Sequence, residues 1–321
     1  MRAAVRRPTS RPALRIGARS ALVLTLVSIA GFTMFMWPLV ISPPDEFSHH
    51  SDAPFVFALI LPGLIAVVLA ELHDGSGRRT DARAGGGRPS GIDTKALAML
   101  GVLTAIGAAL RPLGAGVAGI ETVFFMLILA GRVYGPGFGF VLGSTTMFAS
   151  ALLTGGIGPW LPFQMLAASW VGLGAGLLPR AKGRVEITLL AAYGVVAAYF
   201  YGFVLNMWFW PFTTGTDTQL SFVAGDPVLE NLRRFFVYTV ATSTLGWDTG
   251  RAITNAIAII VLGPAVLAVL RRATRRAAFD APVEFDAPVE FDAPVGSDAT
   301  AVPAAGSPSP ERTATTPTCG G

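Results

Sequence analysis

Eight polar or aromatic residues stand at or near the ends of long apolar runs, where they could bind a small polar molecule. An ionisable group near a membrane span costs a few kcal/mol unless it is paired or lines a polar cavity, so each is a functional candidate. Asp248, Arg251 and Asn255 have the spacing i, i+3 and i+7, which places them on one face of a helix. The other five are Arg111, Glu121, Trp160, Gln164 and Asn206.

These side chains could hold a ligand by stacking on Trp160 and by hydrogen bonds from the amides and Arg251. The segment GGIGPWLPFQM, residues 155–165, favours such a site because its Gly and Pro residues predict a sharp external turn that a ligand can approach. The alternative is that the polar residues snorkel to water, with Asp248 and Arg251 as an i, i+3 pair and the tryptophans in an interfacial belt. We expect one external cavity to be surrounded by Trp160, Gln164, Asn206, Asp248, Arg251 and Asn255, with Arg111 and Glu121 as further binding candidates.

Other chemistries have little support in the sequence. No His lies in an apolar run to serve as a hydrolase base, and there is no phosphate loop or paired acidic motif. His49 and His50 stand near carboxylates in a short external turn, which leaves a metal site as a minor alternative. Cys319 is alone, so no intramolecular disulfide can form. We therefore expect a protein that is not an enzyme and has no cofactor or metal.

The elements that must position these residues are the apolar runs themselves. The chain has 321 residues, 52% hydrophobic and 14% charged, and about 20 apolar residues in a helix cross a bilayer core. We predict an all-α integral membrane protein with eight spans. They cover residues 20–42, 54–71, 94–110, 119–133, 137–154, 161–178, 186–210 and 247–270.

The basic residues orient these spans. With a cytoplasmic N-terminus, every Lys and Arg except Arg111, Arg233, Arg234 and Arg251 falls on the cytoplasmic side, as the positive-inside rule requires. We therefore predict that both termini are cytoplasmic and that the protein lies in the plasma membrane. The net charge of +4 reflects this topology, so we expect no nucleic-acid partner. Arg132 lies at a cytoplasmic turn and is expected to play no part in binding.

Composition divides the chain into five segments. They are a basic cytoplasmic arm (1–19), a two-helix transmembrane hairpin (20–71), a Gly- and Arg-rich cytoplasmic linker (72–93), a six-span core (94–272) and a tail (273–321). The tail repeats the unit FDAPVE and is predicted to be disordered, since six residues of this composition cannot bury a core.

The connection between the last two spans contains a helical pattern. Leu229, Leu232, Phe236 and Val240 recur at helical spacing opposite polar residues, within about 35 residues that pass outside. Two interpretations stay open: an amphipathic helix on the outer surface, or a merely packed loop.

Small residues recur at every fourth position in three of the runs. The rows are Gly101, Ala105 and Ala109; Gly135, Gly139 and Gly143; and Ala168, Gly172 and Gly176. Such rows let helix backbones approach closely within a membrane. We expect two of them to pack within the protein, whereas a row left on the outside would be a docking face for another membrane subunit.

The six-span core resembles the substrate-specific (S) components of energy-coupling factor (ECF) transporters. The likeness covers about residues 94–272 and is strongest in GRVYGPGFGFVLGSTTMFASALLTGGIGPWLPFQMLAASWVGLGAGLLP, residues 131–179. It implies a substrate-binding core for a vitamin, working with a transmembrane coupling subunit (T component) and two cytosolic ATPases. That would explain the missing phosphate loop. It also implies that the first core helix presents Gly101, Ala105 and Ala109 to the T component.

Within that family, residues 158–165 look most like members assigned to cobalamin or a related corrinoid, with thiamine or its pyrimidine precursor as the alternative. A different class, a self-sufficient secondary transporter or channel, usually shows duplicated halves with broken helices and ion-binding groups near the midplane. The sequence shows no such repeat, and its polar groups lie toward one end. Capture of a vitamin outside, followed by ATP-driven uptake, is the favoured function.

Overall fold

The computed structural model describes residues 18–40, 54, 58–66, 94–113, 119–213 and 218–279. All of them belong to one compact unit, Met1–Phe279. Residues 58–66, part of the predicted second span, are helical. The predicted linker, the repeat tail beyond residue 279, most of the basic arm and the turn with His49 and His50 lie outside the described residues.

The described residues form helices and no strand. The labelled helices are α1 (Ala18–Val40), α3 (Thr94–Leu110), α4 (Val123–Tyr134), α5 (Pro136–Thr154), α6 (Leu161–Leu177), α7 (Arg184–Thr213), α8 (Val228–Thr239), the π-helix η1 (Val240–Asp248) and α9 (Thr249–Phe279). Local chemistry sets several boundaries. Pro136 and Pro162 lie in first turns, where a missing N–H costs little, and Gly155 ends α5 with a left-handed φ of 66°.

The described part of the chain is all helical, and its long apolar helices indicate a membrane protein. Among the described residues, four stretches are long and apolar enough to cross a bilayer: Ala18–Trp37, Pro136–Thr154, Arg184–Phe212 and Val228–Thr274. Three shorter apolar helices, Ala96–Leu110, Val123–Tyr134 and Leu161–Leu177, coincide with three more of the predicted spans. The total of eight spans and the side on which each terminus lies stay predictions.

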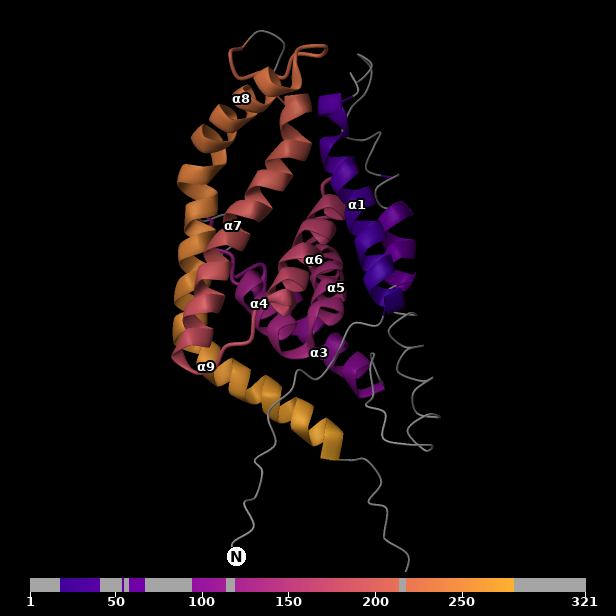
Figure 1. The fold of residues 1–321 in the computed structure, drawn as a ribbon, viewed down its shortest axis with the longest axis vertical. Coiled ribbons are helices and arrows are strands. Elements are labelled where there is room, and N and C mark those ends of the chain that lie inside the picture. The colour runs from indigo at the N-terminus through magenta and orange to yellow at the C-terminus, as the bar shows by residue number, and fades with distance from the viewer. Residues whose placement is uncertain are drawn as a thin grey trace, which may run out of the picture. The chain divides into compact units, whose positions relative to one another are not determined.

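Helices α4, α5 and α6 form the centre of the bundle (Figure 1), and every residue of α4 except Arg132 is buried. Glycines bring α5 and α6 together. A Cβ on Gly139 would meet the carbonyl oxygen of Gly172, and one on Gly143 would meet the carbonyl oxygen of Ala168. Two of the three small-residue rows therefore pack within the protein, as predicted.

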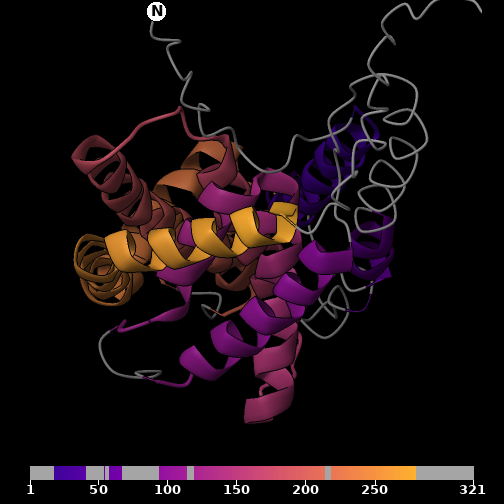
Figure 2. The ribbon, with the colours of Figure 1, turned by 90° about the horizontal axis from the view of Figure 1, so that it is seen from below.

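Helix α7 lies beside the continuous run of α8, η1 and α9 (Figure 1). Small residues permit this approach too, since Gly194 faces Ile259 and Gly202 faces Asp248. α9 contains Pro264, a residue that kinks helices, and its C-terminal turns cross beneath the bundle (Figure 2). There the hydroxyl of Tyr134 donates a hydrogen bond to a carbonyl oxygen of α9 at 3.5 Å.

The connection before the last span differs from the prediction in two respects. A helix is present, α8, but it continues through η1 into α9 without a break, so the last span does not begin at a separate loop. The residues that α8 buries are Asn231, Phe235 and Thr239, while Leu229 and Phe236 of the predicted apolar face are exposed. Leu232 of the same face packs on a hydrophobic cluster with Phe235, so the predicted apolar face is partly exposed and partly packed.

Candidate functional site

Arg251 is the centre of a buried ion cluster. Its guanidinium donates two hydrogen bonds to the carboxylate of Glu121, from Nε to Oε2 at 3.0 Å and from Nη2 to Oε1 at 3.1 Å. Its Nη1 donates to Oδ1 of Asp248 at 2.8 Å and to the carbonyl oxygen of Ala198 at 3.3 Å. Arg251 thereby joins α9 to the segment before α4, to η1 and to α7.

The surroundings of Arg251 make these bonds strong. Its guanidinium carbon lies 4.9 Å from the ring centre of Tyr201 and 5.5 Å from that of Phe124, within the range of cation–π attraction. Only 7% of the Arg251 side chain and 1% of Asp248 are exposed, against 26% of Glu121. Because buried charges are weakly screened, the attraction between Arg251 and the two carboxylates is strong. Of the three side chains, that of Glu121 is the most accessible to solvent.

A π-helical turn positions Asp248. It is the last residue of η1, and its Oδ2 accepts a hydrogen bond from the hydroxyl of Ser243 at 3.0 Å. Gly202 on α7 makes room for the carboxylate, because a Cβ at that position would collide with it. π-helical turns within longer helices are frequent at functional sites.

The predicted face of Asp248, Arg251 and Asn255 does point inward. All three residues are buried, and Asn255 donates from Nδ2 to the carbonyl oxygen of Gly194 at 3.2 Å. Among the described residues its Oδ1 is buried without a hydrogen-bond partner. The i, i+3 pair of the alternative interpretation is also present, but it is buried in the bundle instead of snorkelling to water.

A second polar pair joins α3 to α6. Arg111, just after α3, donates from Nη2 to Oε1 of Gln164 at 2.9 Å. Thr122 connects the segment before α4 to the end of α3, because its hydroxyl donates to the carbonyl oxygen of Leu110 at 2.7 Å. Glu121, a member of the Arg251 cluster, is therefore next in sequence to a residue that is bonded to the end of α3.

Trp160 and Asn206 lie outside these two groups. The indole of Trp160 covers Gly158, donates to the carbonyl oxygen of Gly156 at 3.3 Å and remains 44% exposed. The amide nitrogen of Asn206 is buried without a hydrogen-bond partner within the described ranges. That one cavity is surrounded by Trp160, Gln164, Asn206 and the face of Asp248, Arg251 and Asn255 stays a prediction.

Four residues that contact Arg251 or Asp248 were not predicted from the sequence: Phe124, Tyr201, Gly202 and Ser243. Each resembles an ordinary apolar or small residue of a membrane helix, so its type and spacing gave no signal. The sequence indicated only that Asp248 and Arg251 share an inward face, and charged groups there need polar partners on neighbouring helices.

A different ion cluster makes Arg132 structural. Its Nε donates to Oε1 of Glu186 at 2.9 Å, its Nη1 donates to the carbonyl oxygen of Leu178 at 2.9 Å, and 8% of its side chain is exposed. Arg271 donates to the same Glu186 oxygen at 2.7 Å. The cluster joins α4, α7 and α9, so Arg132 has a structural role, and its predicted absence from ligand binding stays a prediction.

Comparison with known proteins identifies the central part of the chain. A family model described as "ECF transporter, substrate-specific component" matches residues 95–270, more than half of the sequence. The match runs from the start of α3 into α9 and includes both polar groups, whereas α1 precedes it. No curated protein and no solved structure matched the chain.

Proposed function

Because the chain belongs to the family of substrate-specific components of ECF transporters, we propose that it captures a vitamin at the outer face of the plasma membrane for ATP-driven import. S components are substrate-binding subunits, and the T component and two ATPase chains would supply the energy. The main observation in support of a binding site is the presence of two polar groups inside the bundle, the Arg251 cluster and the Arg111–Gln164 pair. Charged groups inside a membrane bundle are costly, and function is the usual reason that they are kept there.

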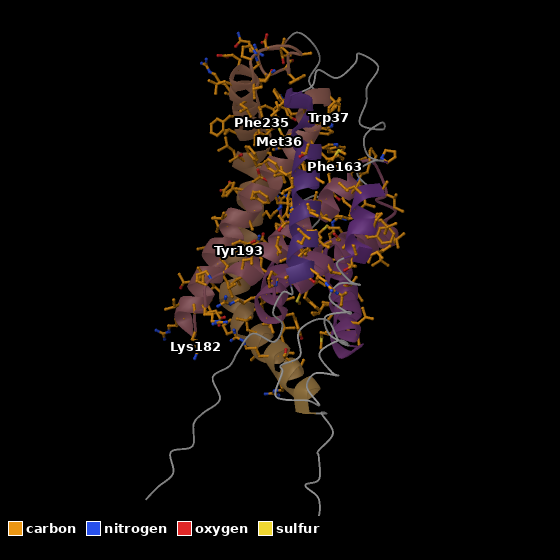
Figure 3. All side chains as sticks on the ribbon, turned by 45° about the vertical axis from the view of Figure 1, so that its right-hand side comes forward. Met36, Trp37, Phe163, Lys182, Tyr193 and Phe235 are labelled. Atoms are coloured by element: carbon orange, nitrogen blue, oxygen red, sulfur yellow. The ribbon has the colours of Figure 1, made fainter. Side chains whose placement is uncertain are left out.

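The proposed orientation has eight spans and both termini in the cytoplasm. The turn with Arg180 and Lys182 and the cluster of Arg132 and Arg271 would then lie at the cytoplasmic end. Lys182 lies at the opposite end of the bundle from Met36, Trp37 and Phe235 (Figure 3). The positive-inside rule favours this arrangement.

In the proposed site, the accessible groups contact the ligand and the buried ones hold them in place. Glu121, Arg111 and Gln164 are partly exposed, and the ring of Trp160 offers a stacking face. Asp248, Arg251 and Asn255 fix the inner wall, and Asn206 contributes an amide. The ligand is cobalamin or a related corrinoid, with thiamine or its pyrimidine precursor as the alternative.

We expect Trp160→Ala and Gln164→Ala each to weaken binding by about tenfold or more, equivalent to about 1.4 kcal/mol. The first variant removes a stacking face, and the second removes a hydrogen-bond partner of both ligand and Arg111. Titration of the purified chain with cobalamin, and separately with thiamine, measures the effect.

Arg180→Ala is the control for both variants, since Arg180 is exposed in the turn between α6 and α7. Arg132→Ala would be unsuitable because the Arg132 side chain, only 8% exposed, is paired with Glu186. Equal loss of binding in all three variants, or no loss in any, would show that the proposed site is wrong.

The exposed row on α3 is the proposed contact with the T component. Gly101, Ala105 and Ala109 are all exposed, and a Cβ on Gly101 would meet nothing within 4 Å. The opposite side of α3 packs on α5, where Thr104 and Thr145 share a hydrogen bond of 2.9 Å. The row is thus open to a second helix from another chain.

Ala105→Trp should abolish copurification of the T component while leaving ligand binding intact, because the indole blocks close helix approach. Ala192→Trp is the matched control, since Ala192 is exposed on α7. Pull-down from cells that express both subunits measures the yield. A wild-type yield of T component with Ala105→Trp would rule out this face as the contact.

The energy source provides the test of the function as a whole. The purified chain should bind its vitamin without hydrolysing ATP, and uptake in cells should collapse when the partner ATPases are inactivated. Proteoliposomes that contain the chain alone are expected to show binding but no concentrative uptake. Sustained uptake there under a proton or sodium gradient would identify a secondary transporter instead.

A further inference from the structure

Helix α1 precedes the residues that match the family, yet it packs on the helices that carry the proposed site. The indole nitrogen of Trp170 on α6 donates to the hydroxyl of Ser28 at 3.1 Å. Gly31 permits close approach, because a Cβ there would collide with the side chain of Leu166. α1 is therefore held by a specific polar bond and a close contact, beyond general apolar attraction.

The two faces of α1 differ in what they contact. Leu22, Leu26, Ile29 and Phe32 are exposed and apolar, which suits contact with lipid. The opposite side of the helix carries Leu24, Val27 and Phe35, which are buried in the main core. Toward the C-terminal end of α1, Met36 and Leu39 join a small hydrophobic cluster built on Met207, Trp210 and Phe235 of α7 and α8. Figure 3 shows Met36 and Trp37 of α1 near the same end of the bundle as Phe235. α1 is thus a constituent helix of the bundle.

An aromatic chain leads from α1 to the proposed site. Phe35 is fully buried, and its ring centre lies 5.1 Å from that of Phe163 in an edge-on arrangement. Phe163 in turn stacks on Trp208 of α7 at 4.6 Å. Phe163 immediately precedes Gln164, whose amide accepts the hydrogen bond from Arg111.

We propose that α1 is part of the substrate-binding unit and that Phe35 is a positioning residue for the Arg111–Gln164 pair. Its ring holds Phe163 against Trp208 and so fixes the first turn of α6 from which Gln164 projects. Without that ring the turn gains freedom, and the ligand must then restrict it on binding. The effect on the ligand rests on the proposed function, whereas the effect on Gln164 does not.

The binding test compares Phe35→Ala with Leu26→Ala, an exposed position on the same helix, in the full chain. Phe35→Ala should weaken binding of the probes cobalamin or thiamine by about tenfold, and Leu26→Ala by less than about twofold. In a Gln164→Ala background, Phe35→Ala should cause almost no additional loss of binding, because it acts through Gln164. Full additivity of the two losses would overturn the positioning role.

A second measurement needs no ligand. In the chain with Gln164→Cys and Cys319→Ser, the rate of maleimide labelling reports the freedom of position 164. Adding Phe35→Ala should raise the rate several-fold, while adding Leu26→Ala should leave it unchanged. Equal rates would overturn the proposal. If the unmodified chain binds neither probe, the proposed ligands are wrong, and labelling still decides the role of Phe35.

Discussion

Arg251→Ala is expected to lower the free energy of unfolding by about 3–5 kcal/mol, the usual effect of removing one partner from a buried ion pair. The change leaves the carboxylate of Asp248 buried with only the hydroxyl of Ser243 as its remaining described partner, and it frees Glu121. It also removes the cation that lies over Tyr201 and Phe124. Titration of the purified protein with SDS in mixed micelles measures the unfolding free energy.

A second substitution separates the lost charge pairing from lost packing. Adding Asp248→Asn to Arg251→Ala should raise the free energy of unfolding again by about 1–2 kcal/mol, because a neutral amide replaces the unpaired buried carboxylate. Arg180→Ala serves as the exposed control. If Arg251→Ala and Arg180→Ala unfold at the same SDS concentration, the cluster contributes nothing to stability.

Gly172→Ala is expected to destabilise the protein by about 1–3 kcal/mol, the typical cost of overpacking a tight interior. The new methyl group would meet the carbonyl group of Gly139, so the backbones of α5 and α6 must move apart. Backbone cannot yield as a flexible side chain can, and this contact lies at the centre of the bundle. The same SDS titration reports the loss.

Gly101→Ala is the matched control, since Gly101 is also a helical glycine but has open space around its Cβ position. Alanine favours a helix over glycine by about 1 kcal/mol, so this variant of the isolated chain should be as stable as the unmodified protein or more stable. A loss of stability with Gly101→Ala that equals the loss with Gly172→Ala would contradict the packing of α5 and α6 described above.

The sequence alone determined most of the helices and the orientation of one polar face. The ends of α3, α5 and α6 lie within one residue of the apolar runs that predicted them, because helix formation in lipid depends on local apolar length. The burial of Asp248, Arg251 and Asn255 followed from helical periodicity and from the cost of exposing such groups to lipid.

Tertiary structure alone decided which polar groups meet. Glu121 and Arg251 are 130 residues apart, and Arg111 and Gln164 are 53 apart, so no local pattern could pair them. The three rows of small residues look alike in the sequence, yet two lie between α5 and α6 and the row on α3 is exposed. The difference arises because burial depends on which helices become neighbours, and that is a property of the whole bundle.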